Sequence, residues 1–174
     1  MKTNSIKLLI NFLILFIVYS SNVFSQNDII SLKQNNLYIE LGGSGGFGSI
    51  NFERIIYSKE YLSFRVLSGI GTINIMDYTN KFNPDILFPV MFTTTLGKIN
   101  NFEMGVGETI SLLVKANSSS FKKERILNFS TIINIGYRYY PKNQNVFFRV
   151  TYTPIIFQNK YYRNWAGLSV GYRF

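Results

Sequence analysis

The sequence predicts an all-β protein, an eight-stranded antiparallel up-and-down transmembrane β-barrel. Three observations lead to this prediction. Apolar and polar side chains alternate with a period of two from Leu37 onward, which is the pattern of strands and not of helices. Short polar turns alternate with longer loops along the same region, as in outer-membrane barrels. A basic and then apolar segment opens the chain, which is typical of an export signal.

Residues 1–25 are expected to be a signal peptide. Lys2 and Lys7 precede an apolar run over Leu8–Val18, and small and polar residues follow it up to Ser25. A membrane-spanning helix needs about 20 apolar residues. Because this run is shorter, we expect cleavage near Ser25, with a single-pass anchor as the alternative. The chain has no cysteine, so lipid attachment through cysteine and disulfide formation are both excluded.

Residues 26–36 are expected to form a short lead-in, and residues 37–174 the barrel. Runs rich in β-branched and aromatic residues define the expected strands. They are Leu37–Gly46, Phe47–Tyr57, Tyr61–Gly71, Phe88–Leu96, Phe102–Leu113, Leu127–Tyr139, Val146–Ile156 and Trp165–Phe174. A strand of about 10 residues, tilted by about 40°, covers the roughly 25 Å apolar band of such barrels. The first connection, GGSGGFG, predicts a very tight reversal.

The alternation also separates an apolar face from a polar face. In a soluble sandwich the apolar face would be the core, whereas in a membrane barrel it faces outward. The polar face carries the candidate lumen network, Glu40, Glu53, Arg65, Glu103, Arg138, Arg149 and Arg173. All nine lysines after residue 25 fall before the expected strands or in turns and loops. An enclosed lumen favours arginine because its planar fork binds a carboxylate with two hydrogen bonds, so these residues are expected to pair.

The last strand, GLSVGYRF, places Leu168, Val170, Tyr172 and Phe174 at alternate positions. With this ending and the export signal, residues 37–174 resemble the small eight-stranded outer-membrane barrels of the OmpA and OmpX type. Two internal segments, LYIELGGSGGFGSINFER and IINIGYRYYP, are similar to parts of barrel proteins in the same broad group. The resemblance implies that these four residues are a C-terminal assembly signal, read by the barrel assembly machinery. It also implies that the protein is located in the outer membrane of a Gram-negative bacterium.

The expected function is a non-enzymatic structural or surface-interaction role through the loops, with no particular external partner. Eight strands leave an interior that side chains just fill, so a wide channel is not expected. The alternatives are a narrow conduit, an envelope-lipid enzyme, or binding of lipopolysaccharide or an external ligand by the loops. The basic loop residues are Lys81, Lys115, Lys122, Lys123, Arg125, Lys160 and Arg163.

The sequence predicts no catalytic residue, no cofactor and no metal. Histidine is absent, which removes the usual general base, the usual zinc ligand and the usual serine-hydrolase partner. No nucleic-acid partner is expected either, since the basic residues are divided between lumen, turns and loops. Partners are therefore expected to be outer-membrane lipid and lipopolysaccharide, besides the assembly machinery.

Two features permit more than one interpretation. Alternation from Glu103 puts Glu108 on the lipid face, whereas a bulge near Gly107 would turn it inward. The aromatic loop residues Tyr78 and Phe82, together with Tyr161 and Tyr162, are interpreted as an interfacial girdle, with a recognition surface as the alternative.

Replacing Phe174 with a charged residue should impair insertion in cells far more than it lowers the stability of the folded barrel. The stability cost at a strand end near the interface is only about 0–1 kcal/mol, whereas the assembly signal loses its final aromatic. The measurements are the heat-modifiable folded protein in outer-membrane fractions and the unfolding midpoint after refolding in detergent. Normal insertion with a large loss of stability would make Phe174 a packing residue only.

Overall fold

The computed structural model describes residues 34–116, 123–142, 144–157 and 162–174. The expected signal peptide and residues 26–33 of the lead-in lie outside the described residues. Within the described ranges, the chain contains no helix that is long and apolar enough to cross a membrane.

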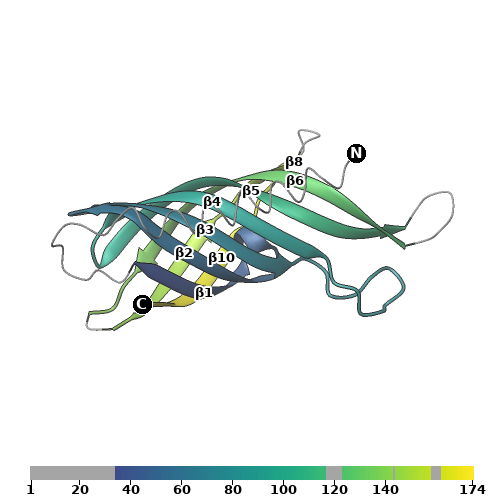
Figure 1. Cartoon of the computed structure of the whole chain (residues 1–174), viewed down its shortest axis with the longest axis horizontal. Coiled ribbons are helices and arrows are strands. Elements are labelled where there is room, and N and C mark those ends of the chain that lie inside the picture. Colours follow the sequence, from purple (N-terminus) through teal and green to yellow (C-terminus); the bar gives the residue numbers. More distant parts are fainter. Residues whose placement is uncertain (1–33, 117–122, 143, 158–161) are drawn as a thin grey trace. The chain divides into compact units, whose positions relative to one another are not determined.

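The described chain is built from antiparallel strands and one short 3-10 turn (Figure 1). In order, they are β1 (Asn35–Gly42), η1 (Gly43–Gly45), β2 (Gly48–Lys59), β3 (Leu62–Thr72), β4 (Ile86–Gly97), β5 (Asn100–Ala116), β6 (Lys123–Tyr139), β7 (Val146–Tyr152), β8 (Ile155–Phe157), β9 (Tyr162–Arg163) and β10 (Ala166–Arg173). The segments β7 and β8 are one barrel strand interrupted at Thr153 and Pro154, and β9 and β10 are another. The barrel therefore has eight strands, and the predicted number is confirmed.

The interruption between β7 and β8 follows from Pro154, which has no N–H to donate to a neighbouring strand. Its carbonyl oxygen still accepts a hydrogen bond from the Ile133 N–H, at 3.2 Å. The Thr153 N–H likewise donates to the Trp165 carbonyl oxygen across the other interruption, at 2.7 Å. The two gaps are thus local and leave the barrel wall continuous.

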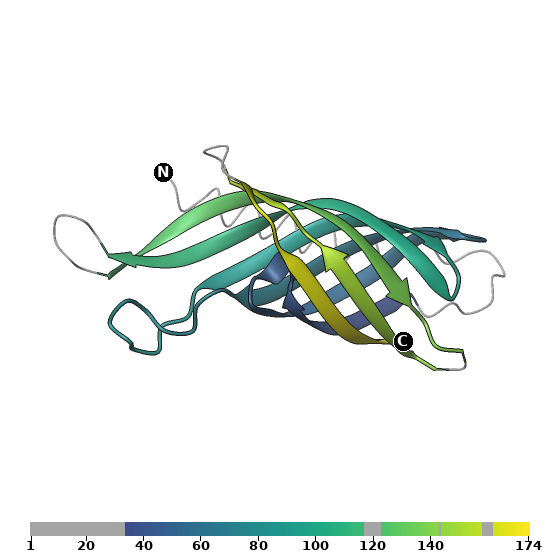
Figure 2. The ribbon, with the colours of Figure 1, turned by 180° about the vertical axis from the view of Figure 1, so that it is seen from behind.

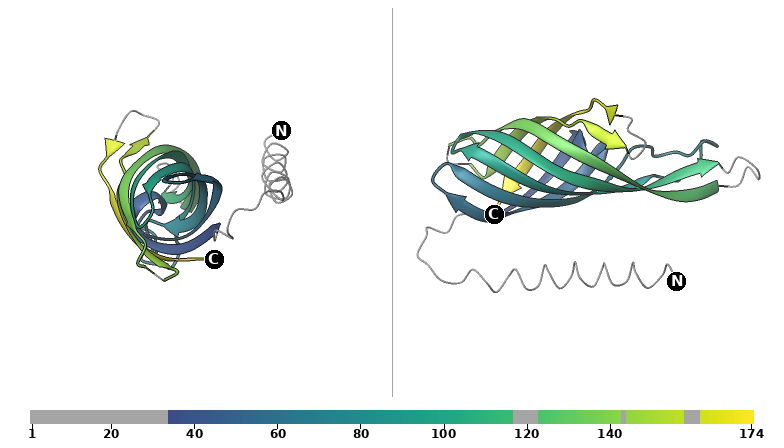
Figure 3. Two further views of the ribbon diagram at one scale, coloured as in Figure 1. Left: turned by 90° about the vertical axis from the view of Figure 1, so that its left-hand side faces the viewer. Right: turned by 90° about the horizontal axis from the view of Figure 1, so that it is seen from above.

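The sheet closes on itself. Neighbouring strands pair in the order β5-β4-β3-β2-β1-β10-β7-β6, and β5 pairs with β6 to complete the ring. Figure 2 shows β10 lying between β1 and β7, and the left view of Figure 3 looks into the ring. A closed sheet has no free long edge, so the predicted barrel is confirmed and the sandwich alternative is wrong.

The strands are strongly tilted. The chain of paired residues that starts at Glu40 and passes through β2, β3 and β4 reaches Ser111 on β5. The chain that passes the other way, through β10, β7 and β6, reaches Asn101 on β5. The stagger around the barrel is the ten residues between these two positions. A stagger of this size in an eight-stranded barrel corresponds to a tilt of about 40°. With eight strands the interior is just wide enough for side chains to fill.

Side chains alternate between an exposed outer face and a buried inner face. The outer face is apolar from β1 to β10, as predicted, and includes Ile39, Ile50, Phe92, Met104, Val106, Ile135, Val150 and Leu168. The inner face holds the charged residues together with a few large apolar groups, Tyr38, Leu67, Met91, Ile132, Tyr140 and Phe147. An apolar exterior around a polar interior is the arrangement of a membrane-spanning barrel.

The connection between β1 and β2 differs from the expected one. The strand predicted to run to Gly46 ends at Gly42, and η1 folds into the lumen, where Ser44 is buried. Gly42, Gly43 and Gly46 have φ angles of 77°, 74° and 89°, which only glycine adopts without strain. The hydroxyl of Thr109 donates to the Ser44 carbonyl oxygen at 3.0 Å. The glycines therefore permit an inward fold and not merely a tight reversal.

Gly171→Ala should lower the free energy of unfolding by about 1–3 kcal/mol, the usual cost of overpacking. An added Cβ at Gly171 would lie 2.4 Å from the Cβ of Tyr38 and 2.5 Å from Cζ of Phe147, inside the barrel. The matched control is Gly48→Ala, since a Cβ at Gly48 meets nothing within 4 Å. Urea unfolding of both variants in detergent measures the difference, and equal midpoints would contradict the tight packing of Gly171.

Candidate functional site

The lumen contains a network of buried ion pairs centred on Arg138. Its guanidinium contacts both oxygens of Glu53, with Nη1 2.5 Å from Oε1 and Nη2 2.8 Å from Oε2. The same group reaches Glu103, whose Oε2 lies 2.7 Å from Nη2 and 3.0 Å from Nε. Arg65 also binds Glu53, with its Nη1 3.0 Å from the same Oε1 that Arg138 contacts. All four side chains are almost completely buried.

The network continues through Arg149. Its Nη2 and Nε lie 2.7 and 2.8 Å from Oε1 of Glu103, and its Nη1 lies 2.5 Å from Oε1 of Glu40. The amide of Asn134 also donates to Glu103, at 2.9 Å. Each carboxylate is thus held by at least one guanidinium, and the three acidic and three basic groups cancel in charge. Such full pairing is what makes buried ions tolerable.

The structure brings six of the seven predicted lumen residues into one connected set and leaves Arg173 apart. The guanidinium carbon of Arg173 lies 4.8 Å from the ring centre of Tyr140, a cation–π contact. Arg173 forms no ion pair with another residue in the described part of the chain.

Sequence reasoning missed three members of the network. Asn36 lies in the predicted lead-in, yet its amide donates to Glu53 at 2.6 Å. The Tyr140 hydroxyl accepts from Arg138 at 3.2 Å, and the N–H of Ser44 in η1 donates to Glu40 at 3.3 Å. Asn36 and Tyr140 each lie two positions from a residue that faces the lumen, Tyr38 and Arg138. Strand alternation would therefore have identified both as lumen residues. The third depends on the inward fold of η1, which no local pattern predicts.

None of the three lumen carboxylates is free to act as a general acid or base. A general acid or base must present a proton site to a substrate, whereas Glu40, Glu53 and Glu103 are all bound to arginine. Among the described residues, no group of three or more potential metal ligands occurs. The network therefore keeps the lumen carboxylates in ion pairs with arginine.

A second ordered feature is the loop between β3 and β4, residues 73–85. Oδ1 of Asp77 accepts from the N–H and hydroxyl of Thr79, at 2.8 and 2.6 Å. Its Oδ2 accepts from the ammonium of Lys123 on β6, at 2.5 Å. The hydrogen bonds from Lys123 and Thr79 hold the pKa of Asp77 well below its usual range. The loop is thereby tied to the neighbouring hairpin.

Asp85 makes a second attachment between this loop and the β5–β6 hairpin. Its Oδ1 accepts from the backbone N–H of Val114, at 2.7 Å, and its Oδ2 accepts from the Asn74 amide, at 2.8 Å. The hairpin continues past Leu112, the last β5 residue that pairs with β4, and the loop lies beside it (Figure 1). Both elements project beyond the closed ring.

This placement bears on the interpretation of the loop aromatics. Tyr78 lies beside Lys123, with the ammonium 5.9 Å from the ring centre, and Phe82 is 79% exposed. Because Lys123 pairs with Ala116 at the far end of the hairpin, the Tyr78 ring lies beside the part of the hairpin that extends past the closed ring; the interfacial girdle stays a prediction. Tyr161 and the side chain of Tyr162 lie outside the described residues.

Glu108 faces outward. Pairing of β5 with β4 and β6 is continuous through this position, with Val90 and Thr131 as its partners, so the bulge considered near Gly107 is absent. The carboxyl group is exposed on the apolar wall. A charge there is unfavourable; for Arg or Lys the cost reaches about 2–4 kcal/mol at the bilayer midplane, and for Glu it is less.

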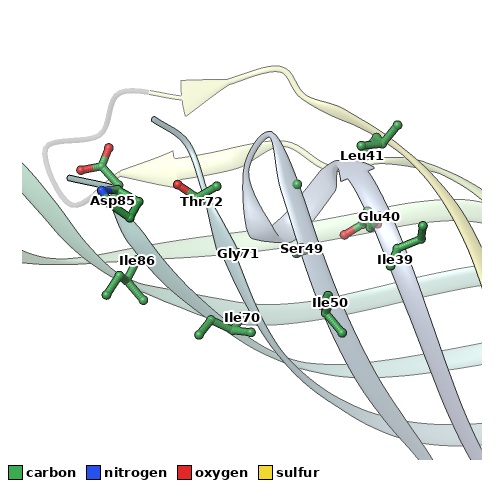
Figure 4. A pocket seen from close by; sticks show the side chains of 12 residues that line it. Ile39, Glu40, Leu41, Ser49, Ile50, Ile70, Gly71, Thr72, Asp85 and Ile86 are labelled. Carbon is green, nitrogen blue, oxygen red and sulfur yellow. The ribbon is translucent and has the colours of Figure 1, made fainter. Parts of the chain in front are cut away.

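A shallow hollow of about 460 Å³ lies on the outer wall near the start of β2. Figure 4 shows Ile39, Leu41, Ile50 and Ile70 directed to one side of the sheet, whereas Glu40 and Ser49 point to the other. Gly48 adds no side chain to the hollow. The hollow is thus lined mainly by apolar side chains of the outer surface, while Glu40 and Ser49, which also border it, direct their side chains to the other side of the sheet.

The chain is similar to solved structures of β-barrel proteins. The N-terminal β-barrel domain of OprF from Pseudomonas aeruginosa is 13% identical, with a TM-score of 0.56 over 81% of this chain and 96% of that domain. The outer membrane protein Ail from Yersinia pestis is 13% identical, with a TM-score of 0.50 over 81% of this chain and 99% of Ail. No protein-family model and no curated protein sequence matches the chain.

At these identities the likeness establishes the fold. The chain has the closed eight-stranded barrel of the small outer-membrane proteins. The resemblance expected from the sequence is confirmed at the level of the fold, a closed eight-stranded antiparallel β-barrel.

Arg138→Leu should destabilise the barrel by about 3–5 kcal/mol, since it leaves two buried carboxylates short of a partner. Lys142→Leu, at an exposed residue of the β6–β7 turn, is the control and should change stability by about 0–1 kcal/mol. Unfolding in detergent, followed by tryptophan fluorescence of Trp165, measures both variants. Equal and negligible effects would mean that Arg138 is not part of a buried network.

Proposed function

We propose that this protein is a non-enzymatic barrel of a Gram-negative outer membrane with a structural or surface-interaction role, exercised through its outer loops. The observation that carries the proposal is the filled lumen. Arg138 and Arg149 bridge the carboxylates across the interior, and η1 occupies the lumen nearer the outer end. An interior closed in this way leaves the loops as the surface for contacts with other molecules.

The loop between β3 and β4 is the main candidate contact surface. It exposes four large apolar or aromatic side chains, those of Ile75, Met76, Tyr78 and Phe82, while Asp77 and Asp85 fix its backbone to the hairpin. Exposed apolar groups gathered on a fixed loop are typical of protein contact sites. A preorganised loop also loses little conformational entropy when a partner binds.

Binding of lipopolysaccharide or an anionic external ligand is the alternative role. Lys81, Lys115 and Arg163 are exposed at the outer end and supply positive charge for phosphate groups. Lys122 and Lys160 lie outside the described residues. Lys123, however, is neutralised by Asp77, and Arg125 donates to Asn83 at 2.8 Å. Lys123 and Arg125 thus already bind residues of the loop between β3 and β4. We therefore favour an apolar contact with a partner over a contact with phosphate groups.

The other two alternatives conflict with the lumen. A narrow conduit would require Arg138 and Arg149 to leave carboxylates that they bind at 2.5 to 3.0 Å. An envelope-lipid enzyme would need a general base, and the chain has no histidine and no unpaired lumen carboxylate among its described residues.

We further propose that the chain is exported with a cleaved signal, so that the mature protein begins near Gln26. Insertion would then depend on the assembly machinery reading the outward side chains Leu168, Val170, Tyr172 and Phe174. Their exposure on the outer face of the closing strand supports this role. The backbone of Phe174 pairs with Asn35 at 2.8 and 2.9 Å, which puts the C-terminal residue at the β1–β10 seam.

Cysteine labelling of intact cells tests this proposal. The chain has no cysteine, so Lys81→Cys in the outer loop and Lys142→Cys in the opposite turn each introduce a unique thiol. A membrane-impermeant maleimide should label Lys81→Cys on intact cells, and Lys142→Cys only after the outer membrane is permeabilised. The reverse pattern, or labelling of neither after permeabilisation, would contradict the proposed location and orientation.

The purified wild-type chain should also give no steady conductance in planar bilayers, because the lumen is filled. Steady ion flow through the wild-type barrel would favour the conduit over the structural role.

A further inference from the structure

Glu108 is the one acidic residue that the structure places within the apolar outer wall of the described barrel. Along β5 it stands between Val106 and Ile110, which share its outward parity, and Leu112 continues the apolar row toward the outer end. Its neighbour on β4 is the outward-facing Val90. The carboxyl is therefore exposed on the wall, with apolar neighbours along β5 and on β4, and it lies four residues before Leu112, the last β5 residue that pairs with β4.

The residue paired with Glu108 on β6 is Thr131, which also faces outward. Neither side chain forms a hydrogen bond or ion pair with another described residue. A lipid bilayer offers no water to replace such bonds. Two adjacent polar groups without partners on a lipid-facing wall therefore point to a partner outside the chain.

We propose that the β5–β6 wall is the contact surface of a homodimer in the membrane, in which Glu108 of each copy accepts a hydrogen bond from Thr131 of the other. The inference rests on the proposed membrane location. It also goes beyond the proposed loop function, because it concerns a different surface and a different partner.

The pattern on the wall fits a two-fold contact. An isologous interface needs a surface that is complementary to itself, and here one paired position supplies both an acceptor, Glu108, and a donor, Thr131. A two-fold axis parallel to the barrel axis and beside the β5–β6 seam relates the two copies. It places Glu108 of each copy opposite Thr131 of the other, so that two reciprocal hydrogen bonds form. The neighbouring outward pairs, Val106 with Ile133 and Ile110 with Phe129, then pack against their equivalents on either side.

A lipid headgroup is a less suitable partner. Ile110 and Leu112 on β5, and Phe129 and Leu127 on β6, lie between the Glu108–Thr131 pair and the outer end of the wall. A headgroup amine would have to pass these apolar side chains to reach the carboxyl. A second copy meets the carboxyl at its own depth, with apolar groups facing apolar groups above and below.

Disulfide cross-linking in membranes tests the proposal on the full chain. Glu108→Cys and Thr131→Cys are produced together with different tags, so that a mixed dimer joins the two cysteines and still keeps one Glu108–Thr131 hydrogen bond. Mild oxidation should link differently tagged copies. The matched control is Ile39→Cys, an outward residue on β1 at the far side of the ring, which should link neither to itself nor to Glu108→Cys.

The strength of the contact is measured by energy transfer between labelled chains in liposomes. Glu108→Val should weaken dimerisation by about tenfold or more, whereas Glu108→Gln, which keeps an acceptor, should retain most of it. Ser68→Val removes another outward polar group and should have no effect. Heat-modifiability checks that every variant is folded.

A monomeric wild-type chain, unchanged dimerisation of Glu108→Val, or equal cross-linking of Ile39→Cys would each overturn the dimer. Failure of the surface labelling at Lys81→Cys would instead contradict the membrane orientation, so the two proposals can fail separately.

Discussion

The bidentate hold of Arg138 on Glu53, shared with Glu103, is the interaction on which the rest of this barrel depends. The arginine is completely buried and joins β6 to β2 across the lumen and to β5 beside it. A lysine could not replace it, since one ammonium cannot present parallel donors to two carboxylates at fixed angles. With the guanidinium in place, each acidic group loses water but keeps a partner, which is the condition for burying charge at all.

From this centre the polar network reaches every strand of the barrel. Arg65 on β3 donates to Thr95 on β4, at 3.2 Å, and Ser169 on β10 donates to Glu40 on β1, also at 3.2 Å. Arg149 on β7 connects the two halves. A slip of one residue in a strand that carries one of these charged side chains would turn that side chain into the membrane. The network therefore specifies the register, whereas the apolar exterior specifies only that the polar face is inside.

The sequence contains enough information for the strands and their faces, because period-two alternation is local to each strand. It identifies Arg138 and Glu53 as lumen residues but does not pair them, since they are 85 residues apart and their meeting depends on how the ring closes. The inward fold of η1 was missed for a related reason. Glycines permit both a tight reversal and an inward turn, and the choice depends on contacts with Glu40 on the preceding strand and with Thr109 on the distant strand β5. The orientation of Glu108 required the continuous pairing on both sides of β5.

Glu103 and Glu108 show how one strand puts the same side chain into two environments. They are separated by an odd number of positions, so alternation sends one carboxyl into the lumen and the other to the lipid. Glu103 is bound by Arg138, Arg149 and Asn134, and these partners account for its burial. Nothing within the described chain does the same for Glu108. Since the bilayer cannot supply the missing hydrogen bond, the reason for a carboxyl on that wall has to be sought in a molecule that packs against it.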